Sequence, residues 1–333
     1  MPFQIIRNDI TKVKADAIVN TANPEVAVGG GVDSAIYKAA GEAELLAERR
    51  KIGFLAPGEV EITPAFNLDA KYVIHVSGPL WNGGNHGEFD ILKKCYERAL
   101  KLALENGCES IAFPLIATGA YGFPKDKALQ IATSVIWQFL FENEMTVILV
   151  VFDQKAFELS GKVFSDVQGY IDENYVEKSY QREYSMHGRR ELWHVPTENL
   201  TPESLEKEGV SLDKLLDSPA ESFQEKLFWL IDKSGLDDVA VYKKANISKK
   251  VFSDIKTKKN YKPSKKTAVA FAIALELTID EAEDLLQRAG IALSPSNKFD
   301  LIVGYYIRHG IYDMMEINLT LFKNEQECIG AIQ

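Results

Sequence analysis

Two short apolar strands, each followed by a glycine-containing loop and the start of a helix, constrain the fold of this chain more than any other feature. The first unit joins residues 17–20 to the glycine run 29–31, and the second joins residues 111–115 to residues 117–124. Glycine lets backbone N–H groups approach a phosphate closely, and a helix N-terminus favours negative charge. Ligands of open α/β sheets bind at the C-terminal ends of the strands. The pattern therefore predicts an α/β domain whose two loops hold a ligand with two phosphates.

Apolar runs and helical stripes extend this pattern over the first half of the chain. Short apolar runs predict strands, and apolar residues at helical spacing predict two long helices between them. Helices on both faces of these strands give a three-layer α/β/α domain with a mixed sheet, which we assign to residues 1–177. The predicted strands are 3–6, 17–20, 59–63, 72–76, 111–115 and 147–152, and the predicted helices are 90–106 and 125–143.

The second half of the chain has a different composition. Residues 178–221 are polar, charged and contain several prolines, which predicts a linker with one short helix at 211–216. Only helical patterns follow, so we assign residues 222–333 to an all-α helical domain. Its apolar stripes lie at 223–231, 268–277, 279–289 and 301–321.

Length and composition limit the functional classes. A chain of 333 residues with 46% apolar residues is long enough for two cores. It has no apolar leader and no apolar run near the roughly 18 residues that span a membrane, and its cysteines are scattered, so we expect a cytoplasmic protein. The histidines and Cys95, Cys108 and Cys328 do not have zinc-site spacing, so we expect no metal and no cofactor.

Positive charge gathers in one segment of an otherwise acidic chain. Residues 243–266 carry ten lysines and a single acid, Asp254, so their net charge is +9. The whole chain has a net charge of −10, which leaves the other residues near −19. That total argues against general nucleic-acid affinity, but the asymmetry predicts a separate role for the lysine-rich segment.

Residues 241–256, which overlap this segment, resemble a helix-turn-helix of the phage-repressor type. Ser248 would cap the second helix, and Asn246 would occupy the turn, where glycine is common. Tyr242 stands where such motifs usually have a small residue. Lysines on the second helix would contact DNA phosphates, and the candidates are Lys249, Lys250 and Lys256. The alternative is a solvated lysine-rich face of a helix bundle that binds a protein partner.

Further motifs in the first half complete a family pattern. Gly58-Glu59-Val60, residues 70–79 and residues 80–84 stand between the two loops in a characteristic order and spacing. Residues 8 to about 177 resemble the macro domain family, which binds ADP-ribose. They are most similar to the bacterial MacroD-type enzymes, which hydrolyse O-acetyl-ADP-ribose and mono-ADP-ribosyl esters. The resemblance implies ADP-ribose or an ADP-ribosylated protein as the partner.

The resemblance also implies roles for individual residues. Asn23 and Asp33 match the pair beside the distal ribose and would be catalytic. Asp9 matches the acid that accepts the adenine amino group, and Tyr121 matches the aromatic residue beside the distal ribose. The implied substrate-binding residues are Asp9, Ile10, Asn20, Gly29, Gly30, Gly31, Val32, Thr118, Gly119, Ala120, Tyr121 and Gly122.

The sequence departs from the family pattern at three positions. Asn8 replaces a glycine, Val28 replaces the first of four glycines, and Ala117 replaces the serine before Thr118. We expect the replacement of a glycine by Val28 to affect loop closure and the turnover rate more than the binding of the ligand. None of the changes removes the pair of Asn23 and Asp33.

The same residues also have structural interpretations that need no ligand. Asp9 is placed to cap a turn, and Asp33 is placed to cap a helix. Asn20 is equally suited to holding its loop, and His75 in an apolar strand is typical of a packed core residue. The sequence alone leaves the choice for Asn20 open, whereas the resemblance favours the functional interpretation for Asp33.

Together these observations predict an enzyme that hydrolyses ADP-ribose esters, with a helical domain that targets or regulates it. The first alternative is a sensor that binds ADP-ribose without hydrolysis and uses the helical domain as its output. The second alternative is a DNA-binding regulator gated by ADP-ribose.

Overall fold

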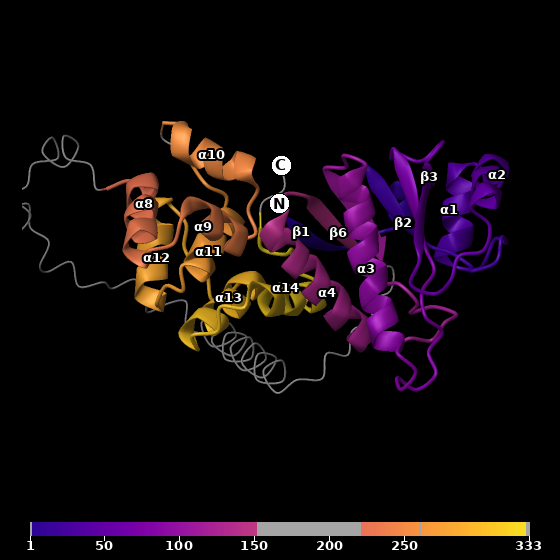
Figure 1. Cartoon of the computed structure of the whole chain (residues 1–333). Helices are drawn as coiled ribbons and strands as arrows, with labels where there is room; N and C mark the ends of the chain where they lie inside the picture. The colour runs from indigo at the N-terminus through magenta and orange to yellow at the C-terminus, as the bar shows by residue number, and fades with distance from the viewer. Residues whose placement is uncertain (1, 152–220, 260, 331–333) are drawn as a thin grey trace, which may run out of the picture.

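The structure, a computed structural model, describes residues 2–151, 221–259 and 261–330. Its strands are β1 (Phe3–Arg7), β2 (Ala17–Thr21), β3 (Val60–Pro64), β4 (Tyr72–Val76), β5 (Ser110–Pro114) and β6 (Thr146–Val151). They form one six-stranded sheet in the order β1-β6-β5-β2-β4-β3 (Figure 1). All neighbouring pairs are parallel except β3 with β4, which confirms the predicted mixed sheet.

Two helical layers cover the sheet, and each has its own core. The helices of this half are η1 (Ile10–Lys12), α1 (Val32–Ala40), α2 (Glu42–Ile52), α3 (Glu88–Glu105) and α4 (Lys125–Glu142). Successive strand residues point to opposite faces. Val19 therefore packs in the core under α3 and α4, whereas Ile18 packs in the core under α1 and α2. This arrangement is the predicted α/β/α sandwich.

Helix α2 has no counterpart among the predicted elements. Its eleven residues are mostly charged, and only Leu45 and Arg49 are buried. The helix therefore lacks the apolar stripe on which the prediction of the other helices depends.

The second half is helical, as expected. Its helices are α8 (Phe223–Ser234), α9 (Asp238–Lys244), α10 (Lys249–Thr257), α11 (Lys265–Ala274), α12 (Ile279–Arg288), α13 (Lys298–Arg308) and α14 (Met314–Lys323). They surround α11, which is buried from Thr267 to Ala274. The apolar stretch 301–321 forms two helices because Gly310, with a φ of +65°, ends the first of them. Residues 178–220 of the predicted linker, with its short helix and the boundary at residue 177, lie outside the described residues.

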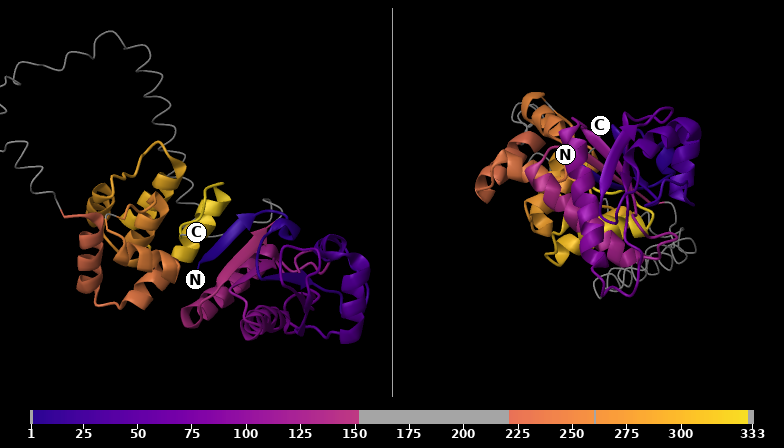
Figure 2. Two further views of the ribbon diagram at one scale, coloured as in Figure 1. Left: turned by 90° about the horizontal axis from the view of Figure 1, so that it is seen from above. Right: turned by 45° about the vertical axis from the view of Figure 1, so that its right-hand side comes forward.

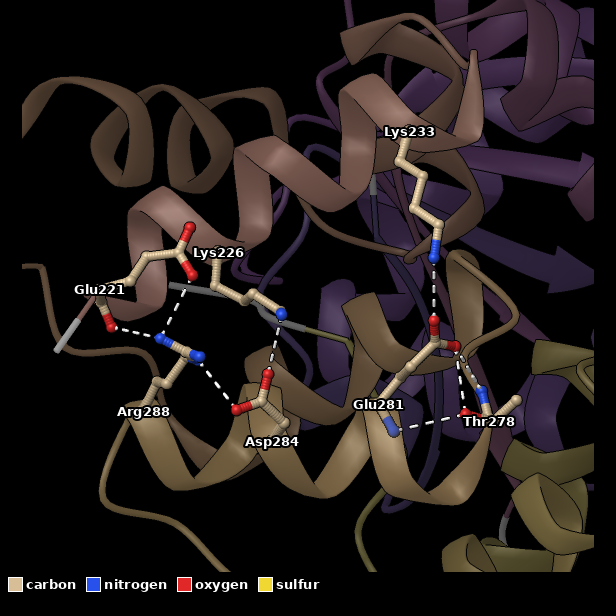
Figure 3. Close-up of polar contacts among 7 residues, drawn as sticks. All are labelled: Glu221, Lys226, Lys233, Thr278, Glu281, Asp284 and Arg288. Carbon is tan, nitrogen blue, oxygen red and sulfur yellow. Dashed lines mark hydrogen bonds and ion pairs between the residues drawn. The ribbon is translucent and has the colours of Figure 1, made fainter.

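Charged side chains connect α8 to α12 along one side of this bundle (Figure 3). Lys226 lies 2.9 Å from Asp284, and Lys233 lies 3.1 Å from Glu281. Arg288 closes the row with a 3.1 Å contact to Asp284. Each exposed pair contributes little alone, but a network gains more because its charges are shared. These contacts favour one register of α8 against α12.

The two halves pack against each other along β1 and α4 (Figure 2). Helix α14 takes part in both cores. Met314, Ile317 and Leu321 lie in the helical core, and Met315, Leu319 and Phe322 pack against the sheet core. The end of the chain therefore packs both on the helix bundle and on the α/β half.

Three residues around the end of α9 make polar contacts with the first half. The Asn246 amide accepts a hydrogen bond from Phe3 N–H at 2.8 Å and donates one to Phe3 O at 2.9 Å. The Tyr242 hydroxyl donates to Glu144 at 2.7 Å, and Lys243 Nζ donates to the Phe141 carbonyl at 2.6 Å. Tyr242 thus replaces the expected small residue because its side chain contacts the other half.

In the part of the chain that the structure describes, we find no helix with both the length and the apolar character needed to cross a bilayer.

Candidate functional site

The two glycine-containing loops meet at one edge of the sheet. β2 and β5 are parallel neighbours, so the loops that follow them leave from the same edge. Helices α1 and α4 begin directly after these loops, with their N-termini at that edge. A third segment joins them, because Trp81 N–H donates to Tyr121 O at 2.9 Å. Backbone donors and two helix N-termini therefore gather where an anionic ligand is favoured.

Asp33 is a buried carboxylate inside this site. Its Oδ1 accepts a hydrogen bond from Asn20 Nδ2 at 2.6 Å, and its Oδ2 accepts one from Gly29 N–H. The residue is only 2% exposed. Burial raises the pKa of Asp33, although the hydrogen bonds from Gly29 and Asn20 and the charge of Arg49 oppose the shift. A carboxylate with a raised pKa is a suitable general base.

Asp33 is not the N-cap of α1. The N-cap residue is Gly31, which has a φ of +63° and makes no side-chain cap. Asp33 is the second residue of the helix, and its side chain reaches back over the loop to Gly29. A helix-capping role therefore does not account for this aspartate.

Two of the three glycines in the run are favoured by the local geometry, Gly29 by its closeness to Asp33 and Gly31 by its backbone conformation. A Cβ atom at Gly29 would lie 3.0 Å from Asp33 Oδ2, and Gly31 adopts a left-handed conformation that other residues disfavour. Val28, which replaces a family glycine, is half-buried and packs against the core under α1. Gly30 is exposed, so its backbone is open to a ligand.

Arg49 on α2 is a buried cation that the sequence pattern does not reveal. Its guanidinium donates to the carbonyls of Asn23 at 3.1 Å, Pro24 at 3.3 Å and Gly53. The residue is 1% exposed. It therefore holds the backbone of the segment that carries Asn23. The Asn23 side chain accepts a hydrogen bond from Glu25 N–H at 3.1 Å, as in a turn.

The second loop approaches Asp33 through Tyr121. Burial and the nearby Asp33 carboxylate both raise the pKa of Tyr121. Thr118 Oγ1 donates to the Leu115 carbonyl at 2.9 Å, which closes the start of the loop. Ala117 has a φ of +64°, a strained value for a residue with a Cβ. The backbones of Gly119, Ala120 and Gly122 are exposed beside these residues.

Asp9 follows β1 at the same edge of the sheet. Its carboxylate accepts hydrogen bonds from Thr11 N–H at 3.0 Å and from the Thr11 hydroxyl at 2.8 Å, and it caps η1. These bonds lower the pKa of Asp9. The turn interpretation is thus confirmed, and contact with adenine stays a prediction. Ile10 is buried, and Val32 is half-buried at the start of α1.

The lysine-rich segment of the second half is largely neutralised by internal contacts. Lys256 lies 2.6 Å from Asp238 of the preceding helix. Lys249 and Lys250 are exposed at the start of α10, after the Ser248 cap. Asn246 has the left-handed φ of +55° expected of the turn position. The other lysines that form ion pairs are Lys243, Lys244, Lys258, Lys265 and Lys266.

His75 is fully buried on β4 and contacts Asn20 and Thr63. Among the described residues, no three His, Cys, Asp or Glu side chains are grouped closely enough to hold a metal ion. His187 and His194 lie outside the described residues.

Comparison with known proteins identifies relatives of the first half. The macro domain family profile matches residues 19–132. A macro domain-containing protein of Methanosarcina mazei is 45% identical over 167 residues, which cover 50% of this chain and 89% of that protein. A protein of Citrobacter rodentium named O-acetyl-ADP-ribose deacetylase is 49% identical over 141 residues, which cover 41% of this chain and 80% of that protein.

Solved structures include a macrodomain of Oceanobacillus iheyensis with ADP. It is 40% identical, with a TM-score of 0.44, and the match covers 46% of this chain and 84% of that chain. The sequence identity to the Methanosarcina mazei protein extends over nearly the whole of that relative. Through its first half, the chain therefore belongs to the macro domain family.

Proposed function

We propose that the macro domain hydrolyses ADP-ribose esters, either O-acetyl-ADP-ribose or ADP-ribose on an acidic side chain. The observation that carries the proposal is the buried Asp33 carboxylate between two glycine-containing loops. A cradle that only bound phosphate would avoid a carboxylate, which repels a phosphate. The name of the Citrobacter rodentium relative, O-acetyl-ADP-ribose deacetylase, supports the same reaction.

In this proposal each part of the site has a separate task. Asp9 accepts a hydrogen bond from the adenine amino group, and backbone N–H groups of the two loops donate hydrogen bonds to the pyrophosphate. Asn23 positions the distal ribose. Asp33 takes a proton from a water molecule as the water oxygen attacks the ester, so the products are free ADP-ribose and a carboxylic acid. Orientation and a base together accelerate such reactions by several orders of magnitude.

A direct experiment separates binding from turnover. The full chain is titrated with ADP-ribose by calorimetry and then incubated with ADP-ribose joined through an ester or through an N-glycosidic bond. We expect micromolar affinity, about −8 kcal/mol, and release of ADP-ribose from the ester alone. Absence of both heat and thermal shift would contradict any ADP-ribose function of the site.

The rival proposal is a sensor, and the packing of the two halves favours it. Tyr242, Lys243 and Asn246 tie the helical half to β1 and α4, so a change in the macro domain has a physical path to the helices. The sensor binds ADP-ribose with the same affinity but releases nothing from either substrate. That outcome of the incubation would replace the hydrolase proposal.

For the helical half we propose a phosphate-binding face on α10, as in a helix-turn-helix. Lys249 and Lys250 are exposed, and neither forms an ion pair with any other described residue. Lys256 is a weaker candidate because Asp238 neutralises it. The whole chain must be tested, since α14 belongs to both cores. Duplex DNA should bind with little sequence preference and a steep salt dependence, and replacing Lys249 and Lys250 with glutamate should abolish it.

A protein partner for the same face is the alternative. It predicts no gel shift with DNA at low salt.

The free thiols of Cys95, Cys108 and Cys328 support the further proposal of a reducing compartment for the protein.

A further inference from the structure

A row of buried polar side chains leads from Asp33 into the sheet. Asn20 on β2 and His75 on β4 are direct partners in the parallel pair, and Thr63 lies beyond them on β3. Asn20 Nδ2 lies 2.6 Å from Asp33 Oδ1 and 3.3 Å from His75 Nδ1. His75 Nε2 lies 3.0 Å from Thr63 Oγ1. None of the four side chains is more than 4% exposed, so the row lies in the interior of the domain.

The hydrogen positions along this row follow from the donors available. The Asn20 amide nitrogen has two hydrogens and accepts none. One hydrogen bonds the Asp33 carboxylate, and the other bonds His75 Nδ1, which must therefore be unprotonated. A neutral His75 then carries its hydrogen on Nε2 and donates it to Thr63. Burial and the charge of Arg49 lower the pKa of His75 to about 3, which keeps the ring neutral.

The orientation of the Asn20 amide leaves its oxygen without a partner. Asn20 Oδ1 is buried and has no hydrogen bond to any described residue. An unpaired buried oxygen of this kind costs about 1–3 kcal/mol. Rotation of the amide would instead turn this oxygen toward the negative Asp33 carboxylate. In the observed orientation the Asn20 amide nitrogen therefore bonds both Asp33 and His75, while the amide oxygen has no hydrogen bond.

We propose that His75, acting through Asn20, is a positioning residue for Asp33. Because His75 Nδ1 accepts one amide hydrogen, Asn20 cannot rotate without losing that bond, and its other hydrogen stays on Asp33 Oδ1. Gly29 N–H holds Oδ2 in the same way. The plane of the carboxylate is thereby fixed, and each oxygen keeps a free lone pair for water. This inference rests on the proposed hydrolase function, in which Asp33 must meet a water molecule in one geometry.

Two variants of His75 of similar size separate positioning from packing. In His75→Asn the new amide oxygen replaces Nδ1, so Asn20 keeps an acceptor. In His75→Gln the amide lies at the level of Nε2, so only the contact with Thr63 is kept. We expect kcat for ester hydrolysis to fall roughly 10- to 100-fold in His75→Gln, because a small misplacement of a reacting group has such effects. The Kd for ADP-ribose should change little, and His75→Asn should retain most of kcat.

A packing role for His75 makes different predictions. The two variants would then lose activity equally, or in proportion to their loss of unfolding free energy in urea. Either result with an active wild-type protein would overturn the positioning role and leave the proposed hydrolase intact. Absence of ester hydrolysis by the wild-type protein would overturn the proposed hydrolase, and the inference with it.

A spectroscopic measurement tests the same row without turnover. Long-range ¹⁵N–¹H correlation spectra distinguish the two neutral tautomers of histidine and the charged ring. We expect wild-type His75 to show the Nε2–H tautomer at both pH 7 and pH 5. A hydrogen on Nδ1, or a charged ring at pH 5, would contradict the donor order and overturn the proposal.

Discussion

Substitution of Asn246 is the sharpest test of how the two halves are joined. β1 is an edge strand, and such edges are usually covered because their backbone groups are unpaired. The Asn246 amide bonds both the N–H and the carbonyl of Phe3, as a neighbouring strand would, and it also donates to Ile329 O at 3.1 Å. All three bonds are buried. A single side chain therefore pairs part of an edge strand with the helical half.

The cost of removing this side chain follows from those contacts. Three hydrogen bonds at about 1 kcal/mol each give roughly 3 kcal/mol, and the buried groups left unpaired raise the total toward about 5 kcal/mol. Asn246→Ala also places alanine at a φ of +55°, which adds about 1 kcal/mol. Asn246→Gly deletes the same bonds without that backbone strain. The difference in unfolding free energy between the two variants therefore measures the cost of the left-handed backbone conformation for a residue with a Cβ atom.

Hydrogen exchange of a peptide that covers β1 measures the effect locally. At 1.4 kcal/mol per factor of ten, a loss of 3 kcal/mol predicts exchange on the order of 100-fold faster. Asn106→Ala is the matched control, because the Asn106 amide bonds only the nearby Leu102 carbonyl on the surface. If Asn246→Gly exchanges no faster than this control, the contact between the halves is not formed as described.

Three further predictions concern the macro domain. Asp9→Ala should weaken ADP-ribose binding, measured by calorimetry, because a charge-assisted hydrogen bond to adenine is lost; unchanged affinity would exclude that contact. Arg49→Met should destabilise the fold by about 2–4 kcal/mol in urea titrations, since three partly buried carbonyls lose their donor; a loss no larger than that of an exposed Arg50→Met control would refute this role. The pKa of His75 falls from 6.5 to about 3 on folding. The unfolded chain therefore binds the proton first, so stability should fall as pH falls below 6.5. Between pH 7 and pH 5 the protonation of His75 alone should lower the free energy of unfolding by about 2 kcal/mol. The His75→Asn variant should lack this contribution, and an equal pH dependence of stability in both proteins would contradict the prediction.

The sequence predicts those features of the fold that depend on local patterns. Apolar runs and stripes identify all six strands, α3, α4, α8, α11 and α12, because burial of one face produces a periodic apolar pattern. Helices α9 and α10 follow instead from the helix-turn-helix resemblance, and the single stretch 301–321 does not show its division into α13 and α14. The two loops are predictable for the same reason, since glycine marks the positions where backbone approaches a ligand. The strand-loop-helix order also predicts that Asp33 lies at the ligand-binding edge of the sheet. Its contact with Gly29 cannot be predicted from that order.

Other features depend on contacts between residues distant in sequence. Arg49 stabilises the Asn23 segment by bonding carbonyls, and a buried arginine in a charged helix leaves no apolar signal. The pairing of Asn20 with His75 depends on the register of β2 with β4, which a single sequence does not contain. Tyr242 occupies a position where helix-turn-helix motifs usually have a small residue, and this difference is visible in the sequence and indicates an additional contact. Its explanation, a hydroxyl bonded to Glu144, requires the other half of the chain.

The central claim is that Asp33 activates water rather than merely shaping the site. The most direct test is to compare the wild-type protein with Asp33→Asn, which keeps the size and an acceptor oxygen but removes the base. We expect ADP-ribose to bind both proteins with similar affinity in calorimetry. Release of ADP-ribose from the ester should fall at least roughly 100-fold in the variant. Wild-type hydrolysis should rise with pH through the pKa of Asp33, which burial raises above 3.8. Unchanged hydrolysis by Asp33→Asn would contradict the claim.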